Sequence, residues 1–243
     1  MILLVPLLLQ AAAPLQNCAE LVKSDPARAL EVANGRILQG GGVSAKHCAA
    51  MAFAALDKWP AAAAAFEQAA QEAERNKLGI AGSLWVQAAN AHLAAGDAAP
   101  AVSALDAALS GGSLTGLARG EAYLDRARAN VALGKPELAR TDMNEALKLV
   151  PQDPLAWLLS ASLARRMGQL DRAQTDIEQA AKLSPDDSSV ALEAGRIALA
   201  SGAPGAARIA FEGAIKNQPG SEGAKAAQAE LDRLGKPGAP PKP

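Results

Sequence analysis

Residues 139–153 read ARTDMNEALKLVPQD, and residues 173–187, which lie 34 positions further on, read AQTDIEQAAKLSPDD. Eight of the fifteen aligned positions are identical. A further step of 34 residues reaches AARIAFEGAIKNQPGS, in which Ala207, Ala214 and Pro219 continue the same columns. Three consecutive segments at one fixed spacing indicate an array of structural repeats.

The repeat columns extend toward the N-terminus and alternate small and large apolar side chains. Three columns in the second half of each unit follow one another at offsets of four and three residues, so they share one face of a helix. They hold alanine, a bulky residue and alanine: Ala62, Phe66, Ala69; Ala101, Leu105, Ala108; Ala139, Met143, Ala146; Ala173, Ile177, Ala180; Ala207, Phe211, Ala214. A small residue also recurs in the first half of each unit, at Ala50, Ala89, Ala127, Ala161 and Gly195. The small residues let a neighbouring helix approach closely, and the bulky residue fills the space between them.

Helix-breaking residues keep the same spacing. Glycine falls between the two helices of successive units, at Gly96, Gly134, Gly168 and Gly202. Glycine there can adopt the left-handed conformation that ends a helix. Proline follows the second helix at Pro151, Pro185 and Pro219, where it cannot continue the helix. Each unit is therefore predicted to be a helix, a tight turn, a second helix and a stop.

This pattern resembles the tetratricopeptide repeat family. The resemblance covers five units, at residues 43–76, 82–115, 120–153, 154–187 and 188–221. Trp85, Tyr123 and Trp157 occupy the family's aromatic place near the start of the first helix. The first two units depart from the pattern, with Asp57 in the place of glycine and Glu74 and Ser113 in the place of proline. The resemblance implies an all-α fold, a right-handed α-solenoid of stacked antiparallel helix pairs.

The two ends of the repeat array are predicted to be covered. Residues 14–42 read as a degenerate helix pair before the first unit. Residues 222–234 read as an amphipathic helix that caps the last unit. The proline-rich tail, residues 235–243, is predicted to be disordered.

The N-terminal residues 1–13 combine a short apolar run with small residues and resemble a secretory signal peptide. They predict a bacterial protein that is periplasmic or secreted. The alternative is an apolar first helix of the fold, because no Lys or Arg precedes the run. In an exported chain Cys18 and Cys48 are expected to pair, and the resemblance would place them on first helices of adjacent units. In a cytosolic chain they would be two buried thiols.

The composition limits the kinds of ligand that this chain is expected to bind. Hydrophobic residues make up 50% of the 243 residues but aromatic residues only 3%, because alanine supplies most of the apolar content. The formal net charge of −1 provides no basic field for nucleic acid or an anionic membrane, so neither is expected as a partner. No stretch is long enough for a membrane span in the mature chain. His47 and His92 lack metal-ligand neighbours at a suitable spacing, so no metal, cofactor or catalytic site is expected.

In this family the first helices of the units line a concave surface that typically holds a peptide or a segment of another protein. By column position, the candidates on that surface are Asn90, Arg128, Ser162, Arg165 and Arg196. Arginine offers a planar fork of donors for carboxylates. Alternatively, Asp125 and Glu193, each three residues before an arginine, would satisfy Arg128 and Arg196 locally. Apolar residues that share the first helices would favour an apolar ligand instead: Val86, Leu124, Leu155, Leu158 and Leu192.

These observations predict a non-catalytic interaction module, an adaptor that presents a preformed groove to a protein or peptide partner. One alternative is a self-associating scaffold in a cell-envelope complex. Another is an enzyme with an unrecognised site in the N-terminal third, which only the adjacent His47 and Cys48 suggest.

Overall fold

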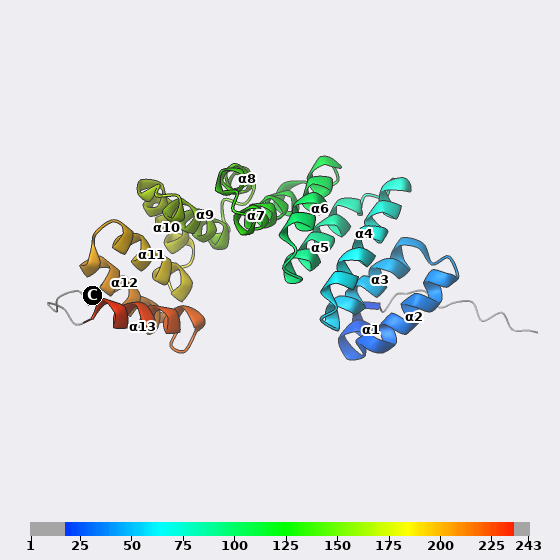
Figure 1. Cartoon of the computed structure of the whole chain (residues 1–243), viewed down its shortest axis with the longest axis horizontal. Coiled ribbons are helices and arrows are strands. Elements are labelled where there is room, and N and C mark those ends of the chain that lie inside the picture. Colours follow the sequence, from blue (N-terminus) through cyan, green and yellow to red (C-terminus); the bar gives the residue numbers. More distant parts are fainter. Residues whose placement is uncertain (1–17, 236–243) are drawn as a thin grey trace, which may run out of the picture. The chain divides into compact units, whose positions relative to one another are not determined.

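A computed structural model describes residues 18–235, and these residues form helices joined by short connections (Figure 1). The predicted signal peptide, residues 1–13, and residues 236–243 of the predicted tail lie outside the described residues. The chain divides into two compact units, Met1–Leu114 and Thr115–Pro243. In both units, helices that follow one another in the chain pack against each other in pairs. The predicted all-helical fold of stacked pairs is confirmed.

The first unit begins with a short helix pair and continues with two full-length pairs (Figure 1). Its helices are α1 (Cys18–Ser24), α2 (Pro26–Leu38), α3 (Gly42–Ala55), α4 (Trp59–Arg75), α5 (Ala81–Ala94) and α6 (Ala98–Ser110). The helix α4 spans 17 residues, whereas the second helices of the last three repeats, which a proline follows, each span 14. Glu74 stands in the place of that proline, so α4 can continue past this position. The helix α6 also lacks the proline but ends at Ser110, directly before Gly111 and Gly112.

The second unit contains three pairs and a final helix (Figure 1). Its helices are α7 (Gly116–Ala132), α8 (Pro136–Leu149), α9 (Pro154–Arg166), α10 (Leu170–Leu183), α11 (Ser188–Ala200), α12 (Pro204–Asn217) and α13 (Glu222–Leu234). The second helix of each pair ends two residues before Pro151, Pro185 or Pro219. The helix α13 packs on α11 and α12, where a capping helix was expected.

The turns within the pairs adopt the left-handed backbone that the glycine columns predict. The φ angles of Gly96, Gly134, Gly168 and Gly202 lie between +69° and +83°. In the turn between α3 and α4, Asp57 occupies the same conformation, with φ at +55°. An L-residue is strained there, although aspartate tolerates the region better than most residues. The turn geometry is thus kept where glycine is missing.

The repeat columns form the core, as their spacing requires. The alanines of the second helices are fully buried, and the bulky residues between them are at most 5% exposed. Gly195 shows how close the helices come, because a Cβ atom at this position would lie 2.3 Å from the ring of Phe211. The identity between repeats therefore reflects helix packing.

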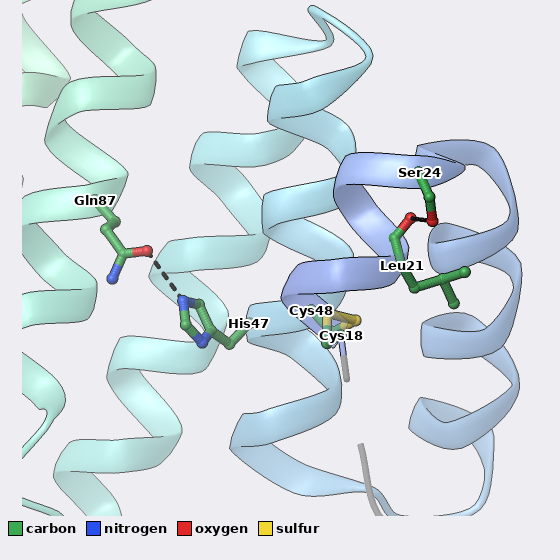
Figure 2. Close-up of a disulfide and its surroundings, with 6 residues drawn as sticks. All are labelled: Cys18, Leu21, Ser24, His47, Cys48 and Gln87. Atoms are coloured by element: carbon green, nitrogen blue, oxygen red, sulfur yellow. Dashed lines mark hydrogen bonds between the residues drawn. A yellow bond between two sulfur atoms is a disulfide. The ribbon is translucent and has the colours of Figure 1, made fainter. Parts of the chain in front are cut away.

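A disulfide joins Cys18 on α1 to Cys48 on α3, with the two Cα atoms 5.9 Å apart (Figure 2). None of the seven residues of α1 is buried. A helix of this length has little stability of its own. The Cys48 side chain, by contrast, is buried beside Ala33 and Ala49. The covalent bond therefore ties a weak terminal helix to a well-packed one.

Candidate interaction groove

A hollow opens in the second unit between the helices α7 and α9. Its volume is about 140 Å³, and Met143 of α8 contributes to its lining. The remaining lining residues come from α7 and α9: Ala127, Arg128, Val131, Leu159, Ser162, Leu163 and Arg166. Apolar side chains therefore dominate the hollow, and two arginines and one hydroxyl supply its polar groups.

A second hollow of about 380 Å³ continues the first toward the turn between α7 and α8. We call the first the inner hollow and the second the outer hollow. The two share Val131, Leu163 and Arg166. The second adds Gly134, Pro136, Glu137 and Met167. We call the two hollows together the α7–α9 groove. Small-molecule sites usually enclose about 300–1,000 Å³, so the inner hollow is suited to a single side chain rather than a whole cofactor.

Two of the predicted binding residues, Arg128 and Ser162, line the inner hollow. The Arg128 side chain is 58% exposed, and its Nη1 lies 3.1 Å from Oδ1 of Asp125. This is the local i,i+3 pair that the sequence offered as the alternative to ligand binding. Such an exposed pair contributes only about 0.2–0.5 kcal/mol, so it does not prevent Arg128 from meeting a ligand.

The predicted candidates Arg165 and Arg196 both turn toward Glu193 of α11. Nε of Arg165 lies 2.7 Å from Oε1 of Glu193, and Nη1 of Arg196 lies 3.9 Å from Oε2. Nε of Arg196 also lies 3.3 Å from Oε1 of Glu230 on α13. The Glu193 side chain is only 6% exposed. These arginines therefore compensate a buried carboxylate and connect α9, α11 and α13.

The fifth candidate, Asn90, lies on α5 in the first unit, where it is exposed. The structure thus brings together Arg128 and Ser162 in one hollow and joins Arg165 to Arg196 through Glu193. Of the apolar alternatives, Leu124 and Leu192 are buried in the core.

Sequence reasoning missed Arg166, which lines both hollows of the groove. The signal was present in its column, five residues after the small residue of the first helix. The other four units hold alanine there, at Ala55, Ala94, Ala132 and Ala200. Helix stacking therefore does not require an arginine at this position.

Buried polar groups hold the helices that line the groove. Asp142 of α8 accepts hydrogen bonds from Nη2 of Arg126 at 2.6 Å and from Nδ2 of Asn130 at 3.1 Å, both on α7. One repeat later, Asp176 of α10 accepts a hydrogen bond of 2.6 Å from Oγ of Ser160 on α9. Asp142 and Asp176 occupy the same repeat column, and both are 4% exposed. The aspartates thus pair each second helix with the first helix of its own unit.

Arg140 of α8 connects these two repeats, because it binds Ser160 of α9. Its Nη1 and Nη2 donate hydrogen bonds of 2.8 and 2.9 Å to Oγ and the carbonyl oxygen of Ser160. Burial lowers the pKa of Arg140, and the charge of Arg172 lowers it further, while Asp176 and Glu137 act in the opposite direction. An arginine keeps its proton through such a shift. A charged network therefore links the helices from α7 to α10, among them the two that line the groove.

The aromatic residues of the first helices contribute to packing. Tyr123 and Trp157 lie against the core cluster around Met143. Nε1 of Trp157 donates a hydrogen bond of 2.8 Å to the carbonyl oxygen of Pro151, and Nε1 of Trp85 donates one of 2.7 Å to Glu74. Their polar groups are thus occupied within the chain.

Residues 18–235 contain neither a metal-binding cluster nor a membrane-spanning helix. No three His, Cys, Asp or Glu side chains gather there as a set that could hold a metal ion. None of the helices in this range has both the length and the apolar character needed to cross a membrane.

Two family models, each described as tetratricopeptide repeat, match residues 120–163 and 158–222. The chain thus contains tetratricopeptide repeats. The two matches fall within the second unit, which also contains the α7–α9 groove. No curated protein matches the sequence.

Solved tetratricopeptide repeat structures share the fold. YrrB, described as a tetratricopeptide repeat protein with an unusual peptide-binding site, superposes with a TM-score of 0.62 at 19% identity, over 83% of this chain and 100% of YrrB. PilW, described as a widely conserved type IV pilus biogenesis factor, gives a TM-score of 0.67 at 21% identity, over 88% and 96%. PilF of Pseudomonas aeruginosa gives a TM-score of 0.62 at 16% identity, over 86% and 99%. At these identities the likeness concerns the fold alone.

Proposed function

We propose that this protein is a non-catalytic interaction module that binds a peptide or protein segment in the α7–α9 groove. The inner hollow carries the proposal, because it opens between two first helices and has an apolar floor of Val131, Leu159 and Leu163. Burying an apolar side chain there would contribute about 1.5–3 kcal/mol. The polar network links α7 to α9 through α8, so little ordering of these helices is expected on binding, which lowers the cost of binding.

Tetratricopeptide repeats generally serve as protein-interaction modules, which supports this proposal. The peptide-binding site for which YrrB is described is a property of that protein, but it shows that this fold can hold a peptide. The alternative of an enzyme depended on a thiol at Cys48. That sulfur is bonded to Cys18, and Nε2 of the adjacent His47 lies 3.0 Å from Oε1 of Gln87 (Figure 2). Cys48 and His47 are thus not arranged as a nucleophile and its base.

We also propose that the protein is exported to the bacterial periplasm or secreted, with residues 1–13 as its signal peptide. The Cys18–Cys48 disulfide supports the proposal, because structural disulfides persist mainly in oxidising compartments. Mass spectrometry of the protein purified from its native cells tests it. A mature N-terminus that starts near residue 14 is expected, and a chain that retains its first residues in the cytosol would contradict it.

A crosslinked pull-down from native cells tests the groove as the binding surface. Ser162→Trp is expected to fill the hollow from its rim and to remove the partners that the wild-type chain retains. The control is Ser103→Trp, which adds the same side chain at an exposed position of α6. Circular dichroism checks that both variants stay helical. Recovery of the same partners in equal yield by Ser162→Trp would show that the groove is not the binding surface.

A further inference from the structure

We infer that the α7–α9 groove selects a peptide segment in which an apolar side chain stands beside an acidic residue. The apolar side chain enters the inner hollow, and Arg166 binds the carboxylate at the rim. The inference rests on the proposed function and adds to it the chemistry of the partner. Its occupant is a segment of another protein.

Arg166 is exposed, and no hydrogen bond or ion pair links its side chain to another residue among 18–235. Neighbouring arginines of the same unit are engaged: Arg126 with Asp142, Arg165 with Glu193, Arg172 with Asp176. An arginine in a column that is otherwise alanine, at the rim of a hollow, is available to a ligand.

The inner hollow is lined by two arginines, Arg128 and Arg166, and by no acidic residue. Arg128 is paired with Asp125, whereas Arg166 has no acidic partner among residues 18–235. Glu137 lines only the outer hollow, and its negative charge also acts on Arg140, where it partly offsets the lowering of the pKa. A neutral apolar ligand would cover Arg166 without offering it an acceptor, which costs free energy. A carboxylate beside the apolar side chain offers an acceptor for the fork of Arg166.

Arg166 borders both hollows, so it lies where a segment would leave the inner hollow and enter the outer one. The side chain that fills the hollow and the one that meets Arg166 must therefore be close neighbours in the bound segment. This predicts a short local motif and not a diffuse attraction between surfaces.

Selection from a displayed library of random short peptides on the immobilised full chain tests the inference. The wild-type chain is expected to enrich peptides with Asp or Glu beside a large apolar residue. Arg166→Ala restores the residue that the other units carry, so its thermal unfolding is expected to match the wild type. It should keep the apolar preference and lose the acidic one. Lys182→Ala, which removes one exposed positive charge from α10 outside the groove, is the control and should select like the wild type.

An enriched synthetic peptide then gives the magnitude by fluorescence anisotropy. Its dissociation constant is expected to rise about tenfold for Arg166→Ala, because a charge-assisted hydrogen bond is lost. The same loss is expected when Glu in the peptide is replaced by Gln, and the two changes together should cost little more than either alone. Equal acidic enrichment by wild type and Arg166→Ala, or additive losses, would overturn the inference.

The outcomes also separate this inference from the proposed function. If the wild type enriches apolar peptides without acidic residues, and Ser162→Trp abolishes their binding, the groove binds peptides but the role of Arg166 is wrong. If the chain enriches nothing above the bare support, peptide binding in the groove fails as well.

Discussion

The two units share one helix-pair scheme but differ in what holds their interiors together. In the second unit the interior contains polar and charged residues: Asn130, Arg140, Asp142, Ser160, Asp176, Ser188 and Glu193. Among residues 18–114, by contrast, no polar or charged side chain is buried, and most of the buried residues are alanine. The first unit instead has the Cys18–Cys48 bond at its end. Alanine columns thus suffice for stacking, and each unit adds its own specific links.

The two units also differ in how well their sequences match the repeat family. The family models match residues 120–163 and 158–222, where the glycine and proline columns are complete. The first unit keeps the helix pairs although Asp57 replaces glycine and Glu74 replaces proline. Packing of the small and large columns is therefore enough to preserve the pairs after the breaker residues have changed.

The largest expected effect comes from breaking the polar interior of the second unit. Asp142→Ala leaves Arg126 and Asn130 without their shared acceptor, and we expect a loss of about 3–5 kcal/mol in the free energy of unfolding. Trp157 is the only tryptophan of the second unit, so its fluorescence in urea, with Trp59 and Trp85 replaced by Phe, follows this unit.

Thr141→Ala is the matched control, because Thr141 is exposed and adjacent in the same helix. Its loss should stay below about 1 kcal/mol. A similar small loss for Asp142→Ala would mean that the buried aspartate is not a principal link of this unit.

Breaking the disulfide is the corresponding experiment on the first unit. The bond closes a loop of 30 residues, and its removal by Cys18→Ser with Cys48→Ser should cost roughly 3–4 kcal/mol, since the unfolded chain gains entropy. Fluorescence of Trp59 and Trp85, with Trp157 replaced by Phe, measures this loss.

Amide hydrogen exchange of the disulfide variant compares the local stability of the two units. Protection is expected to fall in α1, α2 and α3 and to stay unchanged in α9 to α12, because each repeat contacts only its neighbours. An equal loss of protection throughout residues 18–235 would contradict the local role of the disulfide.

The sequence predicts the fold well because the repeat columns are themselves the packing contacts. A column of small residues marks the positions where two helices approach each other, as at the buried Ala146 and Ala180. The glycine and proline columns likewise mark where the helices end. The turn at Asp57 and the long α4 were harder to place, since tertiary packing kept the pair after its local signals were lost.

The candidate site was predicted less completely, for a geometric reason. Column position places a residue on the first helix, but neighbouring positions point about 100° apart. Arg165 accordingly meets Glu193, whereas the next residue, Arg166, reaches the groove. Polar residues on an amphipathic helix are usually solvated, so the recurrence of aspartate at 142 and 176 did not reveal a buried network.

Gly195 lies at a close helix contact of the second unit. Gly195→Ala places a Cβ atom 2.3 Å from the buried ring of Phe211, and we expect overpacking to cost about 1–3 kcal/mol. Adding Phe211→Leu should recover much of the loss, because the resulting Ala–Leu pair is the one at Ala89 and Leu105. Urea unfolding followed by Trp157 fluorescence measures both. A double variant that is less stable than Gly195→Ala alone would show that the ring fills space that leucine cannot.

The smallest effect is expected at the turns, where the same exchange should act in opposite directions in the two units. Asp57→Gly relieves a left-handed residue, and after the added entropy of the unfolded chain we expect a gain of about 0.5–1 kcal/mol. The reverse change, Gly134→Asp at φ +69°, should lose a similar amount. Urea unfolding of each variant, with the tryptophans of its own unit as probes, compares the two signs. A loss in both would mean that Asp57 contributes through its side chain, and that this turn has become specific to the first unit.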